Sequence, residues 1–346
     1  MLSYPDKPRP GDKVAVLSPA AALPGLFPRP FELGLRRLRD DFGLIPVEYP
    51  TTRKLGASQQ ERAADIHGAF ADPAIRAVLT SIGGEDEITV LRHLDPELLR
   101  ANPKPFFGLS DNTNLCNYLW NLGIVSYYGG AVMTSFGRYG RMNPHTEESL
   151  RAALFTHDDY ELRPAHSYTD EEKDWGDDSV DVDAEPPMQP AEGWQWHGPR
   201  QVVTGRVWGG CLEIVDFNLR ASRYLRDPAA YAGCVLLLET SEEMPSDEFV
   251  YRVLMGMGER GLLAQVAAAV IGRPKAWARD QRNTPEQKAE YVVGQREAVL
   301  RAFGEYRPDV PIVFNVDVGH TDPQLVVPIG GEMTVDGERR RITVRY

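Results

Sequence analysis

Short apolar runs alternate with longer amphipathic runs from residue 13 to residue 128, and this alternation constrains the fold more than any other feature. The short runs have strand length and cover 14–17, 45–49, 77–82, 106–109 and 125–128. The amphipathic runs between them cover 31–42, 59–70, 88–94 and 115–122. This rhythm predicts an open parallel sheet with helices on both faces and a binding crevice at the carboxyl ends of the strands. Small or polar residues follow these strands, namely Ser18, Ser81, Gly83, Gly84, Ser110, Gly129 and Gly130.

A second set of strand and helix patterns begins at residue 202 and continues through the 346-residue chain. Strand patterns cover 202–208, 234–238, 267–271 and 312–316, and helical patterns cover 246–260 and 285–303. Alternation around Asp336 and Gly337 predicts a terminal hairpin. The length suits two domains. We predict an α/β fold with a Rossmann-like or flavodoxin-like first domain at 1–155, an irregular connection at 156–200, and a second α/β domain at 201–346.

Residues 170–192, here called the acidic segment, hold most of the negative charge. The segment has ten acidic residues and one lysine, or −9 of the formal net charge of −12, so the rest of the chain is close to neutral. The chain therefore offers no basic face for nucleic acid. Trp175, Trp194 and Trp196 lie in or beside this polar stretch. Large aromatic surfaces need cover or a ligand, so we expect a connection of functional length, with a solvated linker as the simpler alternative.

Several classes of protein are excluded by features that the sequence lacks. It has no run of about 18 apolar residues for a membrane helix, and its first residues lack the apolar core of a signal peptide. Cys116, Cys211 and Cys234 show neither metal-ligand spacing nor an even count for disulfides. There is no P-loop and no G-x-G-x-x-G motif. We expect a soluble cytoplasmic protein with reduced thiols and with no metal, cofactor or membrane contact.

Ser110 lies where the strand pattern 105–109 changes into the helical pattern 111–122. A serine on such a turn is raised above the carboxyl edge of a sheet, beside the first N–H groups of the helix. Asn112 stands where a G-x-S-x-G motif has its second Gly, so the turn is not that motif. Two interpretations stay open at this point: Ser110 is a nucleophile, or it is an ordinary N-cap.

A nucleophilic serine needs a base and a group that orients the base. His320 follows the largely apolar run 314–318 and a single Gly, while Glu239 closes the aliphatic run 235–238. A carboxylate directly after four aliphatic residues needs a hydrogen-bonded or charged partner, which makes Glu239 the best orienting group for His320. An ordinary turn histidine is the alternative for His320. Because Ser110 is predicted in the first domain and its partners in the second, we expect the site between the domains.

The serine also needs N–H donors for the oxyanion. Gly83 and Gly84 follow a predicted strand and can bring bare backbone close to a ligand, although a tight turn explains them equally well. The N–H of Asp111, directly after Ser110, is the other natural donor.

Three blocks of the sequence resemble the catalytic blocks of the LD-carboxypeptidase family of serine peptidases. They are Gly108-Leu109-Ser110-Asp111-Asn112-Thr113, Leu237-Leu238-Glu239-Thr240-Ser241-Glu242-Glu243 and Gly319-His320-Thr321-Asp322-Pro323-Gln324. Supporting blocks at 11–19, 61–70, 81–84 and 205–212 extend the resemblance over nearly the whole chain in collinear order. The resemblance implies a triad of Ser110, His320 and Glu239 and an oxyanion hole from the backbone of Gly84 and Asp111. It also implies no metal, a cytoplasmic enzyme and commonly a homodimer.

The family has two known branches. One trims the terminal D-alanine of the murein tetrapeptide, and the other, the microcin C self-immunity peptidases, cleaves the amide joining a peptide or amino acid to a nucleotide-like moiety. The His320 block and the Trp-bearing insertion look more like the second branch, which implies that Trp175 stacks on a nucleobase. Cys211 stands where the family often has Asn after Gly-Gly, and Glu243 stands where the microcin enzyme has a substrate-contacting Lys. With Trp175, these two positions are the substrate-binding residues that the resemblance implies.

The substrate expected from this resemblance is a small peptide or a peptidyl-nucleotide. Murein tetrapeptide trimming is the alternative within the family. An alternative of another class is a non-catalytic protein that binds a small molecule in the same cleft.

Overall fold

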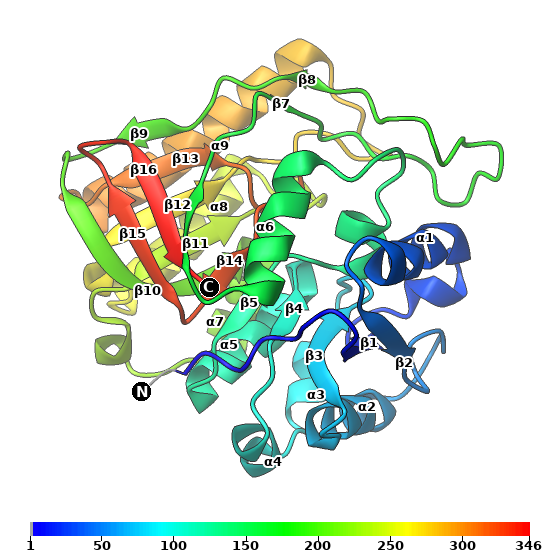
Figure 1. Cartoon of the computed structure of the whole chain (residues 1–346). Helices are drawn as coiled ribbons and strands as arrows, with labels where there is room; N and C mark the ends of the chain where they lie inside the picture. Colours follow the sequence, from blue (N-terminus) through cyan, green and yellow to red (C-terminus); the bar gives the residue numbers. More distant parts are fainter. Residues whose placement is uncertain (1–2) are drawn as a thin grey trace.

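The computed structural model describes residues 3–346, which form two main sheets with helices packed against them (Figure 1). Parallel strands dominate the centre of both sheets. The predicted α/β class, with two parallel-stranded regions and a terminal hairpin, is confirmed.

The first sheet has the strand order β14-β5-β4-β3-β1-β2. Its five parallel strands follow the flavodoxin-like order, which places a topological switch point between β1 and β3. β14 comes from the end of the chain and pairs antiparallel with β5. The strands of this sheet are β1 (Lys13–Leu17), β2 (Ile45–Glu48), β3 (Ile75–Thr80), β4 (Phe106–Gly108), β5 (Ser126–Tyr128) and β14 (Val327–Ile329).

The second sheet has the order β6-β16-β15-β10-β11-β12-β13-β9. Its central four strands are parallel, and antiparallel strands extend it on both sides. The predicted hairpin is β15 with β16, which pairs Asp336 with Arg341. The strands are β6 (Asp159–Leu162), β9 (Gln195–His197), β10 (Val202–Cys211), β11 (Val235–Glu239), β12 (Ala268–Gly272), β13 (Ile312–Val316), β15 (Glu332–Asp336) and β16 (Arg341–Arg345).

Local signals in the sequence account for the ends of several helices. Ser58 and Glu61 form a capping box at the start of one helix, and Thr284 and Gln287 form another. Helix α5 ends at Gly123, whose φ of 86° provides the left-handed C-cap. The helices are α1 (Pro28–Asp40), α2 (Gln59–Ala71), α3 (Ile88–Leu91), α4 (Pro96–Ala101), α5 (Thr113–Leu122), α6 (Pro144–Phe155), α7 (Leu212–Ala221), α8 (Asp247–Glu259) and α9 (Pro285–Tyr306).

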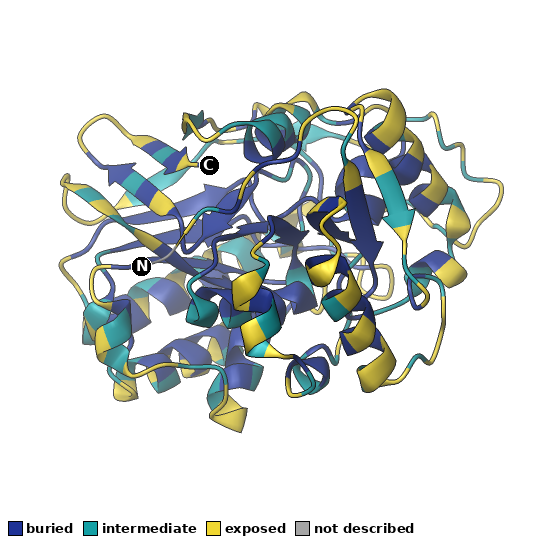
Figure 2. Cartoon of the chain, turned by 60° about the horizontal axis from the view of Figure 1, so that its bottom comes forward, coloured by how far each residue is buried: buried dark blue, intermediate teal, exposed yellow. Residues whose placement is uncertain are grey.

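Strands β4, β5, β11, β12 and β13 are buried along their whole length, and the centre of both sheets is dark in Figure 2. β11 reads Val-Leu-Leu-Leu-Glu with every residue buried. Continuous apolar runs of this kind are expected in parallel strands, because both faces of the sheet are covered. Within residues 3–346, no helix combines the length and the apolar character that a membrane span requires.

Some elements were not predicted from the sequence. Helices α4, α6 and α7 are short or of mixed polarity. The sequence shows strand alternation at 324–329, where β14 lies, but the pairing of β14 with the first sheet was not predicted. The connection at 156–200 is not wholly irregular, since it holds β6, β9 and a small ribbon of β7 (Ser167–Tyr168) with β8 (Gln189–Pro190). The domain boundaries remain predictions.

Candidate active site

Ser110 lies between β4 and α5, on a short turn of 3₁₀ helix that covers Ser110–Asn112. Its φ is 62°, in the left-handed region that residues other than glycine seldom adopt. Gly83 lies directly beside it: a Cβ on Gly83 would come within 2.7 Å of Ser110 Cβ and 3.4 Å of the Asp111 nitrogen. The turn after β3 therefore has to be bare backbone where it meets the serine.

Glu239 and His320 form a hydrogen-bonded pair in the second sheet. Glu239 is the last residue of β11, and His320 follows β13 by four residues. The distance from His320 Nδ1 to Glu239 Oε2 is 2.7 Å, and the Glu239 side chain is fully buried. Gly319, at φ 101°, allows this approach, because a Cβ there would lie 2.2 Å from the same oxygen.

A second carboxylate faces the other nitrogen of the imidazole. Glu242 Oε2 lies 3.3 Å from His320 Nε2, and the Glu242 side chain is 55% exposed, whereas that of His320 is 10% exposed. Burial disfavours the imidazolium, but the charge and hydrogen bond of Glu239, together with Glu242, raise the pKa of His320 to about 9. The two carboxylates therefore favour the protonated imidazole.

The serine and the histidine are not hydrogen-bonded to each other. Over residues 3–346, Ser110 Oγ has no hydrogen-bond partner. Contacts between catalytic groups are commonly loose without substrate and tighten in the complex.

Tyr128 connects the two halves of this cluster, and the sequence reasoning missed it. It ends β5 and is fully buried. Its hydroxyl oxygen accepts a 3.0 Å hydrogen bond from Ser110 N–H, and it donates a 2.5 Å hydrogen bond to Glu239 Oε1. The available signal was a phenol at a strand end, since a buried tyrosine hydroxyl usually has a partner.

The peptide after the serine is held rigidly by the Asp111 side chain. Asp111 is fully buried and accepts hydrogen bonds from Glu87 N–H at 2.9 Å and from Asn114 Nδ2 at 2.8 Å. Gly84 lies one residue beyond Gly83, and its Cβ direction points at Ala20 and Ala21 rather than at the serine. Both expected oxyanion donors therefore lie in turns that meet at Ser110, with Gly83 in the closer contact.

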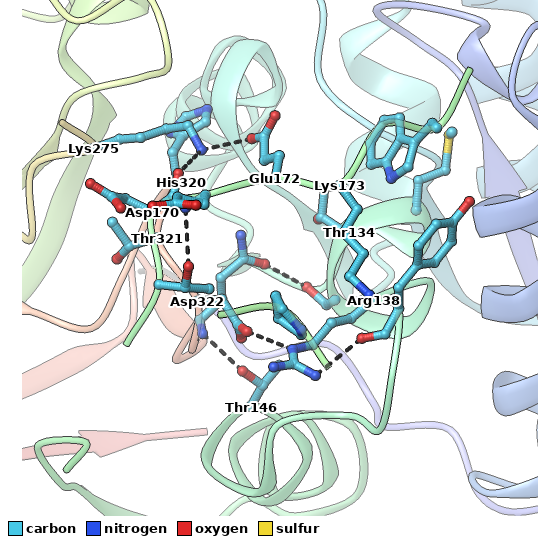
Figure 3. A pocket seen from close by; sticks show the side chains of 18 residues that line it. Thr134, Arg138, Thr146, Asp170, Glu172, Lys173, Lys275, His320, Thr321 and Asp322 are labelled. Atoms are coloured by element: carbon cyan, nitrogen blue, oxygen red, sulfur yellow. Dashed lines mark hydrogen bonds and ion pairs between the residues drawn. The ribbon is translucent and has the colours of Figure 1, made fainter. Parts of the chain in front are cut away.

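A pocket opens beside His320 and continues beneath the acidic segment (Figure 3). One wall comes from the first half of the chain, including Thr134, Arg138 and Thr146, and the other includes Lys275 and His320. Lys275, buried to 1% exposure, donates to Asp170 O at 2.9 Å and to Glu172 Oε1 at 2.8 Å. The pocket is thus lined by charged groups of both signs, and Lys275 is paired with a carboxylate of the acidic segment.

Trp175 lines the same pocket as His320. Its ring centroid lies 6.0 Å from that of Phe27, at an interplanar angle of 57°. Trp194 is instead held by a hydrogen bond from Nε1 to Asp317 Oδ2 at 2.9 Å, and Trp196 belongs to β9. Of the three tryptophans that the sequence singled out, Trp175 is the one that the structure places at the pocket.

Cys211 and Glu243 do not line this pocket. Cys211 is buried at the end of β10, and its Sγ lies 3.2 Å from Glu213 Oε2. Glu243 is exposed, and its backbone N–H donates to Ser241 Oγ at 3.1 Å. Nothing in the structure brings either side chain to His320. In the described part of the chain, no group of three or more His, Cys, Asp or Glu residues is arranged to hold a metal ion.

Comparison with known proteins matches both halves of the chain to one family. Residues 14–129 match the LD-carboxypeptidase N-terminal domain, and residues 204–335 match the LD-carboxypeptidase C-terminal domain. The Escherichia coli microcin C7 self-immunity protein MccF is 26% identical over 82% of this chain and 78% of its own length. The murein tetrapeptide carboxypeptidase of Pseudomonas aeruginosa is 24% identical over 95% of this chain and 94% of its own.

The crystal structure of an MccF-like protein from Streptococcus pneumoniae, solved in complex with AMP, has the same fold. It is 26% identical, has a TM-score of 0.85, and covers 97% of this chain and 99% of its own. The fold and the matched halves define the class as an α/β serine peptidase. The chain belongs to the LD-carboxypeptidase family.

Proposed function

We propose that this protein hydrolyses the amide bond between an amino acid or peptide and a nucleotide-like moiety, through a triad of Ser110, His320 and Glu239. The observation that carries the proposal is one continuous pocket lined by His320 at one place and Trp175 at another, below the acidic segment. An imidazole and an aromatic ring in one cavity suit a substrate with a scissile carbonyl and a flat base. Ser110 is not among the residues that line this cavity and lies on the turn beside Gly83. A base stacked on an aromatic side chain contributes about 1–3 kcal/mol.

In the proposed mechanism, neutral His320 accepts the Ser110 Oγ proton at Nε2 while Oγ attacks the carbonyl carbon. Glu239 orients the ring through Nδ1 and stabilises the imidazolium that forms. The N–H groups of Gly84 and Asp111 are the proposed donors to the oxyanion. His320 then protonates the leaving nitrogen, and water hydrolyses the acyl-enzyme.

The resting structure requires one rearrangement for this chemistry. Glu242 faces Nε2, the nitrogen that has to receive the serine proton. Because Glu242 is half-exposed, it can rotate toward solvent when substrate brings Ser110 and His320 together.

Relatives support both the nucleotide-like substrate and its alternative. One MccF structure is described in complex with aspartyl sulfamoyl adenosine, which has the proposed linkage, although at 22% identity that similarity shows the fold alone. The Pseudomonas relative acts on murein tetrapeptide and covers more of the chain. Murein trimming is therefore the second candidate. A cytoplasmic location and a homodimer remain predictions.

The test compares wild type with Ser110→Ala on two substrates, aspartyl sulfamoyl adenosine and murein tetrapeptide. We expect release of aspartate by wild type and a loss of about 10⁴–10⁶-fold in kcat for Ser110→Ala. Equal turnover by both proteins would refute the triad. Release of D-alanine as the only fast reaction would reverse the choice of branch, and binding of sulfamoyl adenosine without turnover of either substrate would indicate a binding protein.

A further inference from the structure

Among the described residues, only Tyr128 has a side chain that is hydrogen-bonded both to the turn of Ser110 and to the Glu239 carboxylate. It is fully buried and is not among the residues that line the pocket beside His320, so we expect it not to touch substrate. We propose that Tyr128 is a positioning residue of the reaction, which holds Ser110 and Glu239 in register across the junction of the two sheets. This inference rests on the proposed function of the triad.

The direction of the two hydrogen bonds follows from proton counting. Ser110 N–H can only donate, so it fills a lone pair of the Tyr128 oxygen at 3.0 Å. The single phenolic proton is then free for Glu239 Oε1, which lies 2.5 Å away. Burial and the adjacent carboxylate raise the pKa of Tyr128 well above its usual value, so the phenol keeps this proton.

One consequence concerns how Glu239 holds the histidine. Its two oxygens have separate partners, since Oε1 accepts from Tyr128 and Oε2 lies 2.7 Å from His320 Nδ1. A carboxylate held at both oxygens cannot rotate about its terminal bond. The Tyr128 hydroxyl also draws negative charge toward Oε1, so Oε2 stabilises the His320 imidazolium less strongly. Tyr128 therefore affects both the angle of the ring and its basicity.

The other consequence concerns the nucleophile. Ser110 adopts a φ of 62°, and the N–H of this strained residue donates its hydrogen bond to the Tyr128 hydroxyl oxygen. Tyr128 pairs in register with Gly108, two residues before the serine, so its ring and the turn lie on adjacent strands. β5 belongs to the first sheet and Glu239 to the second, so one phenol spans the two sheets at the reacting groups.

The neighbouring residue provides a matched control. Tyr127 is equally buried, and its hydroxyl has no hydrogen-bond partner within residues 3–346. Its ring stacks on Phe107 at a centroid distance of 4.7 Å. Tyr127→Phe thus removes the same atom from the same strand without breaking a hydrogen bond.

The experiment measures kcat, KM and the pH dependence of kcat/KM for wild type, Tyr127→Phe and Tyr128→Phe with aspartyl sulfamoyl adenosine. We expect Tyr127→Phe to match wild type. For Tyr128→Phe we expect kcat to fall by about 10–100-fold with little change in KM. This is the scale of loss found in metalloenzymes when a residue that orients a metal ligand through a hydrogen bond is removed. The acidic limb of the kcat/KM profile, in which His320 loses its proton, should move to higher pH in Tyr128→Phe, because Glu239 then stabilises the imidazolium more strongly.

A second variant keeps the test decisive if Tyr128→Phe folds poorly. A fluorinated tyrosine placed at position 128 keeps the shape and makes the phenol a stronger donor, so the acidic limb should move the opposite way, to lower pH. The proposal would be overturned if Tyr128→Phe had wild-type kcat and pH dependence. It would also be overturned if the acidic limb of the kcat/KM profile did not move in the fluorotyrosine variant. Ser110→Ala measured alongside separates the two hypotheses: an active Ser110→Ala refutes the proposed function itself, whereas an inactive Ser110→Ala with an unaffected Tyr128→Phe refutes only the role of Tyr128.

Discussion

Glu239 beside His320 and the carboxylates of the acidic segment are the same chemical group in two different surroundings. The Glu239 side chain is fully buried and has a phenol and an imidazole as partners. Asp174 and Glu185 are 48% and 43% exposed, and their partners are arginines. An ionised carboxylate in the interior depends entirely on its few partners, whereas a surface carboxylate shares its charge with water and salt. We therefore expect the proposed catalysis and the attachment of the segment to depend on charge in separate ways.

The partners of the acidic segment come from both parts of the chain. Arg138, which follows β5, donates to Glu185 at 2.6 Å. On the other side, Lys288 of α9 pairs with Asp170 at 2.7 Å and Arg279 pairs with Asp174 at 2.6 Å. In Figure 1 this green segment crosses the molecule from the region of α9 toward α1. Its excess of negative charge thus serves to attach a cover over the pocket, which a charge count alone does not reveal.

The largest effect is expected where the carboxylate is most buried. Glu239→Gln keeps the shape but replaces one acceptor oxygen by a donor, which faces either the Tyr128 hydroxyl or His320 Nδ1. We expect kcat to fall by about 10³–10⁴-fold, the scale found when the orienting acid of a serine triad becomes an amide. Steady-state kinetics with aspartyl sulfamoyl adenosine measure the loss. Glu290→Gln, an exposed substitution on α9, is the control. A loss below tenfold would mean that Glu239 does not orient the base.

The sequence predicted the parts of this site that depend on strand ends. Ser110 and Glu239 each follow a continuous apolar run, and His320 follows another, so parallel pairing brings them to neighbouring sheet edges. Tyr128 could not be found in this way, because its partners Ser110 and Glu239 are 18 and 111 residues away in the sequence. A tyrosine in an apolar run is also typical of an ordinary core residue.

Other features depended on side-chain direction or on pairing across the chain. Cys211 lies beyond the predicted strand 202–208 and ends the observed strand β10, and the α7 helix that begins after it places Glu213 against its Sγ, in the interior. Glu242 and Glu243 are adjacent in sequence, and only the first faces His320. β14 pairs with β5, and the paired residues Tyr128 and Val327 are 199 residues apart in the sequence. No local sequence pattern encodes such a distant pairing.

An intermediate effect is expected for Glu242, which is half-exposed beside a buried imidazole. Removal of its charge favours neutral His320, so Glu242→Gln should move the acidic limb of kcat/KM from about pH 9 to lower pH. The shift should be about one pH unit or less, because solvent screens this carboxylate. At pH 7 the rate with the nucleotide substrate should therefore rise, by at most about tenfold. A lower rate at pH 7 with an unmoved limb would show instead that Glu242 binds substrate.

The same shift has a consequence for stability. A histidine with a folded-state pKa of about 9 and an unfolded value of about 6.5 stabilises the fold fully below pH 6.5, and this stabilisation is lost as the pH rises through 9. Thermal unfolding from pH 6 to pH 10 should show a smaller decline for Glu242→Gln than for wild type.

The smallest effect is expected for the acidic segment. Burial opposes the ionisation of Glu185, but hydrogen bonds from the Arg138 side chain and from Arg141 N–H lower its pKa to about 2. Glu185→Gln removes this charge while Arg138 keeps its contact with Asp322. Because Glu185 is 43% exposed, we expect a loss of only about 0.5–1 kcal/mol in the free energy of unfolding. Denaturant titration at low salt measures it.

Salt then tests whether the two groups of carboxylates differ as proposed. Raising the ionic strength to about 1 M shortens the screening length to about 3 Å, so the stability difference between wild type and Glu185→Gln should nearly vanish. The loss of kcat in Glu239→Gln should stay the same, because no solvent reaches that side chain. If salt restored the activity of Glu239→Gln, or left the stability difference of Glu185→Gln unchanged, the contrast between a buried carboxylate with a proposed catalytic role and a screened surface carboxylate would be wrong.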